Sequence, residues 1–189
     1  SPTICNGQSA TLTANGGTTY SWNTGSTTNP LSVSPVTTTS YTVTGTSLGC
    51  TSTAVSTVTI ISSPVVNVNS VTICAGDSAS LFASGATTYL WSTGSTSNPL
   101  LVNPVSTTSY TVTGTTSGCT GSSVGTVTVD PIPATPTISV SGLVLTSSSA
   151  TGNQWYLNGV IIPGATGSTY TVTVNGNYTV VVTTAGCSS

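Results

Sequence analysis

Residues 20–50 read YSWNTGSTTNPLSVSPVTTTSYTVTGTSLGC, and residues 89–119 repeat them as YLWSTGSTSNPLLVNPVSTTSYTVTGTTSGC. The two stretches align without a gap at an offset of 69 positions, which indicates an internal tandem repeat. A third, diverged copy keeps the order of Trp155, Tyr178 and Cys187. The repeat therefore predicts three domains, for which we expect the ranges 1–63, 64–131 and 132–189.

Short segments that alternate apolar and polar residues predict an all-β fold. Residues 9–14 and 41–44 alternate at a period of two, which is typical of a half-buried strand, and residues 53–61 give the longest strand of the first domain. Strands this short, separated by turn residues at intervals of roughly 8–12 residues, are typical of a β-sandwich. We therefore predict tandem small immunoglobulin-like β-sandwich domains, joined by short Pro-bearing linkers into a rod.

Aromatic residues recur at equivalent places in the repeat and are the expected core. Trp22 lies where an immunoglobulin-like domain has its core Trp, and Tyr41 opens a later strand, at the place of a tyrosine corner. The equivalent residues of the other copies follow by position. The predicted structural core is Trp22, Trp91, Trp155, Tyr41, Tyr110 and Tyr178.

The chain carries almost no charge. It contains no Lys, Arg or His, its only acidic residues are Asp77 and Asp130, and 43 Thr and 32 Ser supply most of the side-chain polarity. Because neutralising phosphates requires cations, we expect no nucleic-acid partner. No apolar run approaches the roughly 18 residues of a membrane span, so we expect no membrane insertion.

The same composition argues against catalysis. General acid–base chemistry needs a proton shuttle, and the two Asp residues lie 53 positions apart in different domains with no His or Lys to assist them. A calcium site would need several carboxylates, and the cysteine spacing does not match a zinc site. We therefore expect no enzyme, no catalytic residue, no metal and no cofactor.

Five cysteines predict a disulfide framework. Cys5 and Cys50 share the first domain, and Cys74 and Cys119 occupy the same places in the second, so we expect the pairs Cys5–Cys50 and Cys74–Cys119. Each would close a loop of about 45 residues and stabilise its domain by roughly 4 kcal/mol. Cys187 is then an unpaired or intermolecular thiol. Disulfides predict a location outside the reducing cytosol.

The third domain is expected to be incomplete at its C-terminal strand. About ten strand residues follow Cys50, but only Ser188 and Ser189 follow Cys187. We expect the sequence to be a piece of a longer array, in which chain continuation or a strand from an adjacent copy covers the open edge.

Two motifs resemble known surface modules. The first is Y-x-W-S/N-T-G-S-T…S-Y-T-V-T-G-T…G-C, within residues 20–50 and 89–119; the second is Q-W-Y-L-N-G-V-x-I-x-G-A-T…G-x-Y-T-V…G-C, within residues 154–187. They resemble Ig-like and PKD-like modules of large surface proteins that Bacteroidota export, often by type IX secretion, including gliding-motility adhesins. The chain departs from ordinary members in having no Lys or Arg.

The resemblance implies an extracellular, cell-surface protein. It also implies O-glycosylation at Asp-Ser or Asp-Thr followed by a small residue, which Asp77-Ser78-Ala79 matches, so Ser78 is the candidate modified residue. Added mass on the Ser78 peptide of native material would check this expectation.

The expected function is that of a non-enzymatic structural stalk or filament segment of an extracellular bacterial surface adhesin. Its expected partners are neighbouring repeats or copies of itself, with surface glycans as further candidates. The alternative is a glycan-binding module of a secreted protein. The exposure of the three Trp side chains distinguishes the two, because sugar stacking needs an exposed aromatic face and core packing does not.

Overall fold

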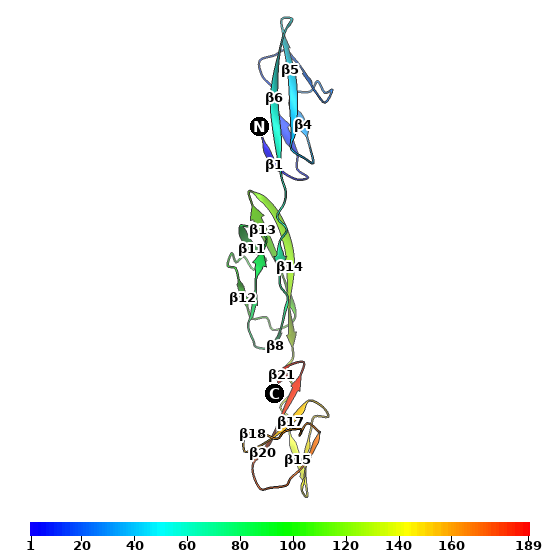
Figure 1. Cartoon of the computed structure of the whole chain (residues 1–189), viewed down its shortest axis with the longest axis vertical. Coiled ribbons are helices and arrows are strands. Elements are labelled where there is room, and N and C mark those ends of the chain that lie inside the picture. The colour runs from blue at the N-terminus through cyan, green and yellow to red at the C-terminus, as the bar shows by residue number, and fades with distance from the viewer. The chain divides into compact units, whose positions relative to one another are not determined.

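The computed structural model describes all 189 residues, and its regular secondary structure consists entirely of β-strands. Each sheet draws its strands from one of three consecutive stretches, residues 3–61, 67–130 and 138–188, which we call the first, second and third sandwich (Figure 1). The prediction of an all-β fold of tandem immunoglobulin-like sandwiches is confirmed. No helix long and apolar enough to cross a membrane is present.

The first sandwich is built around a long antiparallel hairpin of β5 (Thr39–Ser47) and β6 (Cys50–Ile61), with β1 (Thr3–Cys5) parallel to β6 on its other side (Figure 1). Its two sheets face each other, and buried residues alternate along the short strands, as in β2 (Ala10–Leu12) and β4 (Leu31–Val33). The larger sheet has the order β1 (Thr3–Cys5), β6 (Cys50–Ile61), β5 (Thr39–Ser47), β3 (Thr19–Trp22); the smaller pairs β2 (Ala10–Leu12) with β4 (Leu31–Val33).

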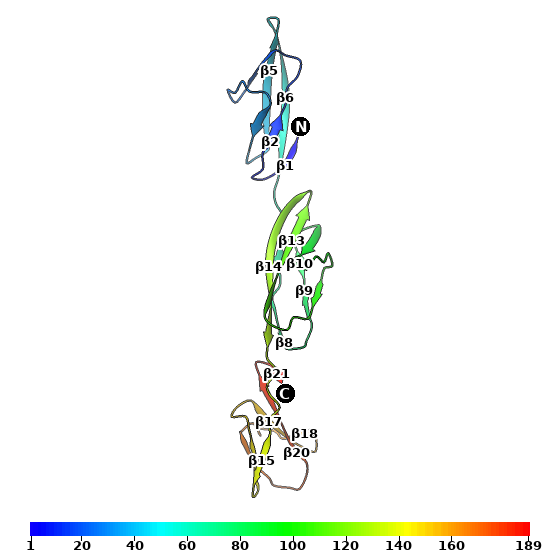
Figure 2. The ribbon, with the colours of Figure 1, turned by 180° about the vertical axis from the view of Figure 1, so that it is seen from behind.

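The second sandwich repeats this plan and adds a two-stranded pair, β7 (Asn67–Val68) with β10 (Ala83–Ser84). Its larger sheet has the order β11 (Thr88–Trp91), β13 (Thr108–Thr116), β14 (Cys119–Asp130), β8 (Val71–Cys74), and a smaller one pairs β12 (Leu100–Val102) with β9 (Ala79–Leu81). The additional strand β7 (Asn67–Val68) pairs with β10 (Ala83–Ser84), which Figure 2 shows from behind, next to β9. The first sandwich has no counterpart of β7.

The third sandwich differs in how its first strand pairs. β15 (Ile138–Ser141) pairs antiparallel with β16 (Val144–Ser147) instead of joining the last strand, and β16 pairs with β19 (Thr169–Thr171). The other sheet has the order β18 (Val160–Ile161), β17 (Asn153–Leu157), β20 (Tyr178–Thr184), β21 (Cys187–Ser188). The strand that begins at the cysteine of this domain, β21, pairs with β20 but is only two residues long, whereas β6 and β14 have 12 residues each. That this domain is incomplete at its C-terminal strand stays a prediction.

The chain also divides into two compact units, and both include part of the second sandwich. The first consists of Ser1–Val68, Ala83–Asn98 and Thr111–Val124, and the second of Asn69–Phe82, Pro99–Tyr110 and Gly125–Ser189. These bounds differ from the three expected domain ranges, which remain a prediction.

Each sandwich has a Trp at its centre. Trp22, Trp91 and Trp155 are 4%, 2% and 0% exposed, and each indole N–H donates to a backbone carbonyl 2.9 Å away. These tryptophans are therefore core residues. Tyr41 is buried as well, whereas Tyr110 and Tyr178 are half-buried.

Strand periodicity sets the cost of substitution along β11. Replacing Trp91 with Ala should lower the unfolding free energy of the second sandwich by about 3–5 kcal/mol, because a fully packed ring leaves a cavity. The neighbouring Leu90 points outward and is 52% exposed, so Leu90→Ala should change it by no more than about 0.5 kcal/mol. Hydrogen exchange of the β11 and β13 amides measures the change in unfolding free energy in each variant. Equal losses of stability in the two variants would contradict the assignment of Trp91 to the buried face and Leu90 to the exposed face.

Candidate functional site: the disulfide junctions

One cysteine of each sandwich lies at the tip of a hairpin. Cys50, Cys119 and Cys187 each follow a two-residue turn in which both residues have positive φ, as a type I′ turn requires. The turns are Leu48-Gly49 (50° and 81°), Ser117-Gly118 (50° and 82°) and Ala185-Gly186 (51° and 85°). The turn thus fixes each of these cysteines at the first position of the strand that follows it.

The other two cysteines lie at the opposite end of that strand. Cys5 ends β1 and pairs in register with Ile61, and Cys74 ends β8 and pairs with Asp130. The strand from Cys50 to Ile61 has 12 residues, so its ends are about 36 Å apart at roughly 3.3 Å per residue. Disulfide-bonded residues have Cα atoms within about 7 Å. Two cysteines of one sandwich therefore cannot bond each other.

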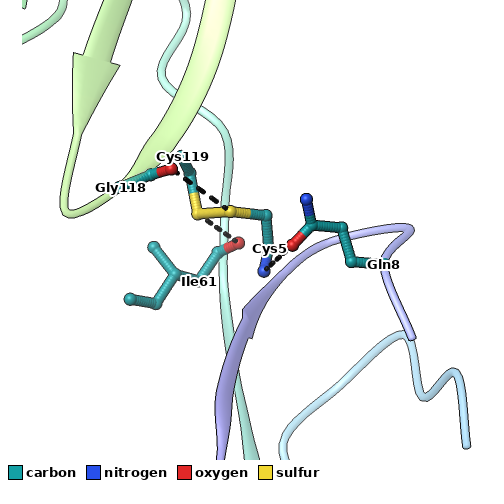
Figure 3. The surroundings of a disulfide bond; sticks show 5 residues. All are labelled: Cys5, Gln8, Ile61, Gly118 and Cys119. Carbon is teal, nitrogen blue, oxygen red and sulfur yellow. Dashed lines mark hydrogen bonds between the residues drawn. A yellow bond between two sulfur atoms is a disulfide. The ribbon is translucent and has the colours of Figure 1, made fainter. Parts of the chain in front are cut away.

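The structure instead joins Cys5 to Cys119 and Cys74 to Cys187, with 5.6 Å between the Cα atoms in each pair (Figure 3). The predicted pairs Cys5–Cys50 and Cys74–Cys119 were wrong. So was the prediction that Cys187 is unpaired or intermolecular. The free thiol is Cys50, which is exposed. Cys5 and Cys119 both belong to the first compact unit, and Cys74 and Cys187 to the second.

The two junctions have the same construction. At the first, the sulfur of Cys119 lies 3.9 Å from the carbonyl oxygen of Ile61, the residue that pairs with Cys5 (Figure 3). At the second, the sulfur of Cys187 lies 4.0 Å from the carbonyl oxygen of Asp130, which pairs with Cys74. In both, the hairpin-tip cysteine of one sandwich is bonded to the first-strand cysteine of the sandwich before it.

The candidate glycosylation residue lies beside the second junction. Ser78 is exposed, and the Nδ2 of Asn103 lies 3.4 Å from its hydroxyl oxygen while donating to the carbonyl of Gly76 at 3.0 Å. Asp77 and Ser78 line a pocket of about 470 Å³ together with Cys74 and Cys187. The hydroxyl is accessible, and its modification stays a prediction.

In the first two sandwiches, a tyrosine hydrogen bond that the sequence did not predict closes the loop before the central Trp. The Tyr20 hydroxyl donates to the carbonyl of Gly17 and accepts from its N–H, both at 2.9 Å, and Tyr89 does the same with Ala86 at 2.9 and 3.0 Å. In the third sandwich the Tyr178 hydroxyl donates to the carbonyl of Val174 at 2.9 Å, which is the geometry of a tyrosine corner. No group of three or more His, Cys, Asp or Glu that could hold a metal is present.

No protein-family model matches the chain, and no curated protein sequence matches it either. Among solved structures it is similar to extracellular domains 3–5 of Drosophila OTK, with 13% identity over 100% of this chain and 91% of that one and a TM-score of 0.40. It is also similar to titin domains I67–I69 in an E-to-A mutated variant, with 11% identity over 100% and 92% of the two chains and a TM-score of 0.43. At these levels the likeness carries no argument about function.

The disulfide pairing predicts which cysteine a thiol-alkylating reagent can modify. Under non-reducing conditions, peptide mapping by mass spectrometry should find Cys5–Cys119 and Cys74–Cys187, and a thiol-alkylating reagent should label Cys50 alone. Cys119→Ser should release Cys5 as a second labelled thiol and remove roughly 5 kcal/mol of loop-closure stabilisation, given the separation of 114 residues. Cys50→Ser is the control and should leave thermal stability unchanged. A Cys5–Cys50 peptide would contradict the structure.

Proposed function

We propose that this chain is a non-enzymatic, tension-bearing segment of an extracellular stalk or filament, in a bacterial surface adhesin. The observation that carries the proposal is the pair of disulfides, which join consecutive sandwiches instead of closing single ones. Core stabilisation alone would be served by a bond inside a sandwich. A bond between consecutive sandwiches additionally limits how far the chain can be extended.

The two disulfide loops overlap, and this overlap shortens the path along which force is carried. One loop spans residues 5–119 and the other spans residues 74–187, so residues 74–119 belong to both. The shortest covalent route from Cys5 to Cys187 crosses one disulfide, follows the 45 residues between Cys119 and Cys74, and crosses the other. Along the backbone alone the same two residues are 182 positions apart. A pulled chain is thus held to about a quarter of its free length, even if sandwiches unfold.

The disulfides also support a location outside a reducing cytosol, since such bonds form and persist in oxidising compartments. The finer assignment to a bacterial cell surface is supported by the resemblance of the repeat motifs to secreted surface modules. The alternative of a glycan-binding module has less support, because all three Trp rings are buried and their N–H groups are bonded internally.

Single-molecule stretching by the chain ends tests the proposal. With both disulfides intact, the contour length between Cys5 and Cys187 should not exceed about 170 Å, from roughly 3.5 Å per residue over the 45-residue route plus 5.6 Å between the Cα atoms at each disulfide. After reduction it should reach about 640 Å. Cys50→Ser should behave as the unaltered chain, and Cys119→Ser with Cys187→Ser should behave as the reduced one. An oxidised chain that extends to the full length would overturn the tension-bearing role.

A further inference from the structure

The second sandwich carries a segment across its edge that the first sandwich lacks. Residues 64–68, PVVNV, run along β10, and Val66 is buried against the core. A Cβ at Gly85 or Gly121 would overlap the carbonyl oxygen of Val65 or Pro64, respectively. A Cβ at Gly114 would lie 2.6 Å from the Cγ2 of Val66. Three glycines thus leave the space in which this segment lies.

The first sandwich has an open groove at the equivalent place. The groove has a volume of about 460 Å³, and among its lining residues are Leu12, Ala14, Gly16, Trp22, Val43 and Gly45. At the repeat offset of 69, Gly16 and Gly45 correspond to Gly85 and Gly114. A Cβ at Gly16 would meet nothing within 4 Å, and one at Gly45 would meet the ring of Tyr20 at 3.4 Å and the Cα of Gly17 at 3.9 Å. The space that the segment fills in one sandwich is empty in the other.

Exposure and pairing around the groove agree with a missing strand. Ala14 is half-buried, whereas the equivalent Ala83 of the second sandwich is 1% exposed. Val43 is 7% exposed, whereas its equivalent, Val112, is 0% exposed. Ala83 pairs with Val68 of β7, whereas no strand pairs with Ala14. The N–H and carbonyl of Ala14 are bonded to the Asn29 side chain, as those of Ala83 are bonded to Asn98. The next residue, Asn15, is the counterpart of Ser84, which pairs with Asn67. Its backbone, beside an unfilled apolar channel, is where an added strand would pair.

We propose that this groove binds an extended segment of the PVVNV kind, antiparallel to residues 14–15, supplied by the linker of another sandwich of this repeat type. No side chain of the lining is charged, which fits an uncharged, valine-rich strand. Alternate side chains provide the specificity, because the valines equivalent to Val66 and Val68 enter the channel while the residue between them faces outward.

One lining residue indicates how the occupant differs from residues 64–68. Ser52 stands where the second sandwich has Gly121, and a Cβ there would overlap the carbonyl oxygen of Pro64. The first residue of the occupant is therefore displaced from the position equivalent to Pro64, while its valines occupy the positions equivalent to Val66 and Val68. Removing the Ser52 side chain should improve the fit of a segment that begins with Pro.

The test uses a labelled peptide of residues 62–69, SSPVVNVN, titrated into the 189-residue chain and followed by fluorescence anisotropy. We expect saturable binding, weakened by about tenfold or more in Gly45→Val, which fills the channel, and tightened in Ser52→Gly. Ser40→Val, on an exposed position of the same strand, is the matched control and should leave binding unchanged. Equal binding of a peptide carrying Val66→Asp, or of the chain carrying Gly45→Val, would overturn the proposal.

A second experiment attaches the segment covalently to the chain, which removes the entropic cost of binding a separate peptide. Adding PVVNVN before Ser1 reproduces the junction of Asn69 with Ser70. Amides of residues 13–15 and 52–56 should then exchange about tenfold more slowly than in the unextended chain, and the same extension with Asp at the second valine should give no protection. If neither the peptide nor the extension occupies the groove, the proposal is wrong.

The free thiol of Cys50 differs from the two equivalent cysteines, and this difference is a separate observation from the groove. The cysteines at the two other hairpin tips, Cys119 and Cys187, are both bonded to the first-strand cysteine of the preceding sandwich. Cys50 follows the same turn and is free and exposed. A second copy of the chain has no free first-strand cysteine, since Cys5 and Cys74 are bonded and the third sandwich has Ser139 at that place.

We infer that Cys50 forms a disulfide with the first-strand cysteine of another sandwich of this repeat type. The two thiols lose two protons and two electrons as the S–S bond forms. A disulfide oxidant such as oxidised glutathione accepts them and leaves as two thiols. The bond would covalently fix the sandwich whose linker fills the groove.

A fusion supplies such a sandwich. A copy of residues 1–69 carrying Cys50→Ser is placed before Ser1, and the protein is refolded with oxidised glutathione. Non-reducing peptide mapping should find Cys50 bonded to the Cys5 of the added copy, with the two native disulfides unchanged. With Cys5→Ser in the added copy, Cys50 should remain free. A Cys50–Cys50 dimer or a glutathione adduct as the sole product of the first fusion would overturn the inference.

Discussion

The parallel pairing of the first strand with the long last strand is the constraint on which the rest of the structure depends. It sets β1 against the end of β6 and β8 against the end of β14, so the two cysteines of a sandwich lie at opposite ends of a 12-residue strand. Since a disulfide cannot cross that distance, oxidation has to link one sandwich to the next. The covalent organisation of the chain is thus a consequence of strand direction.

These covalent links matter because the other sources of stability are modest. Each sandwich has about 60 residues, and domains of that size bury a comparatively small core. With no Lys, Arg or His, no side-chain ion pair can form. Cross-strand hydroxyl pairs take their place on the exposed faces, such as Ser40 with Thr57 at 2.9 Å and Ser109 with Thr126 at 3.0 Å. Because these contacts are uncharged, salt should affect the fold little.

The repeat symmetry is broken at three places, and all three concern how a sandwich connects to another. The first sandwich has an open groove where the second holds residues 64–68. Its hairpin-tip cysteine, Cys50, is free where the equivalent ones are bonded. The third sandwich has Ser139 where the others have a first-strand cysteine. The sandwiches share a core design, and their differences lie in their connections.

The sequence by itself determined the features that local chemistry controls. Alternation at a period of two gave the strands, the 69-residue offset gave the tandem plan, and repetition identified the tryptophans of the core. The partners of Cys5 and Cys74 could not be read in the same way. They depend on whether β1 and β8 run parallel or antiparallel to the strand beside them, and period-two alternation looks the same in both directions. Equivalent positions in a repeat suggested pairs within each domain, whereas the direction of one short strand placed those cysteines too far apart to bond. The groove was likewise decided only by the tertiary structure, because its lining brings together residues far apart in the sequence, such as Leu12, Val43 and Ser52.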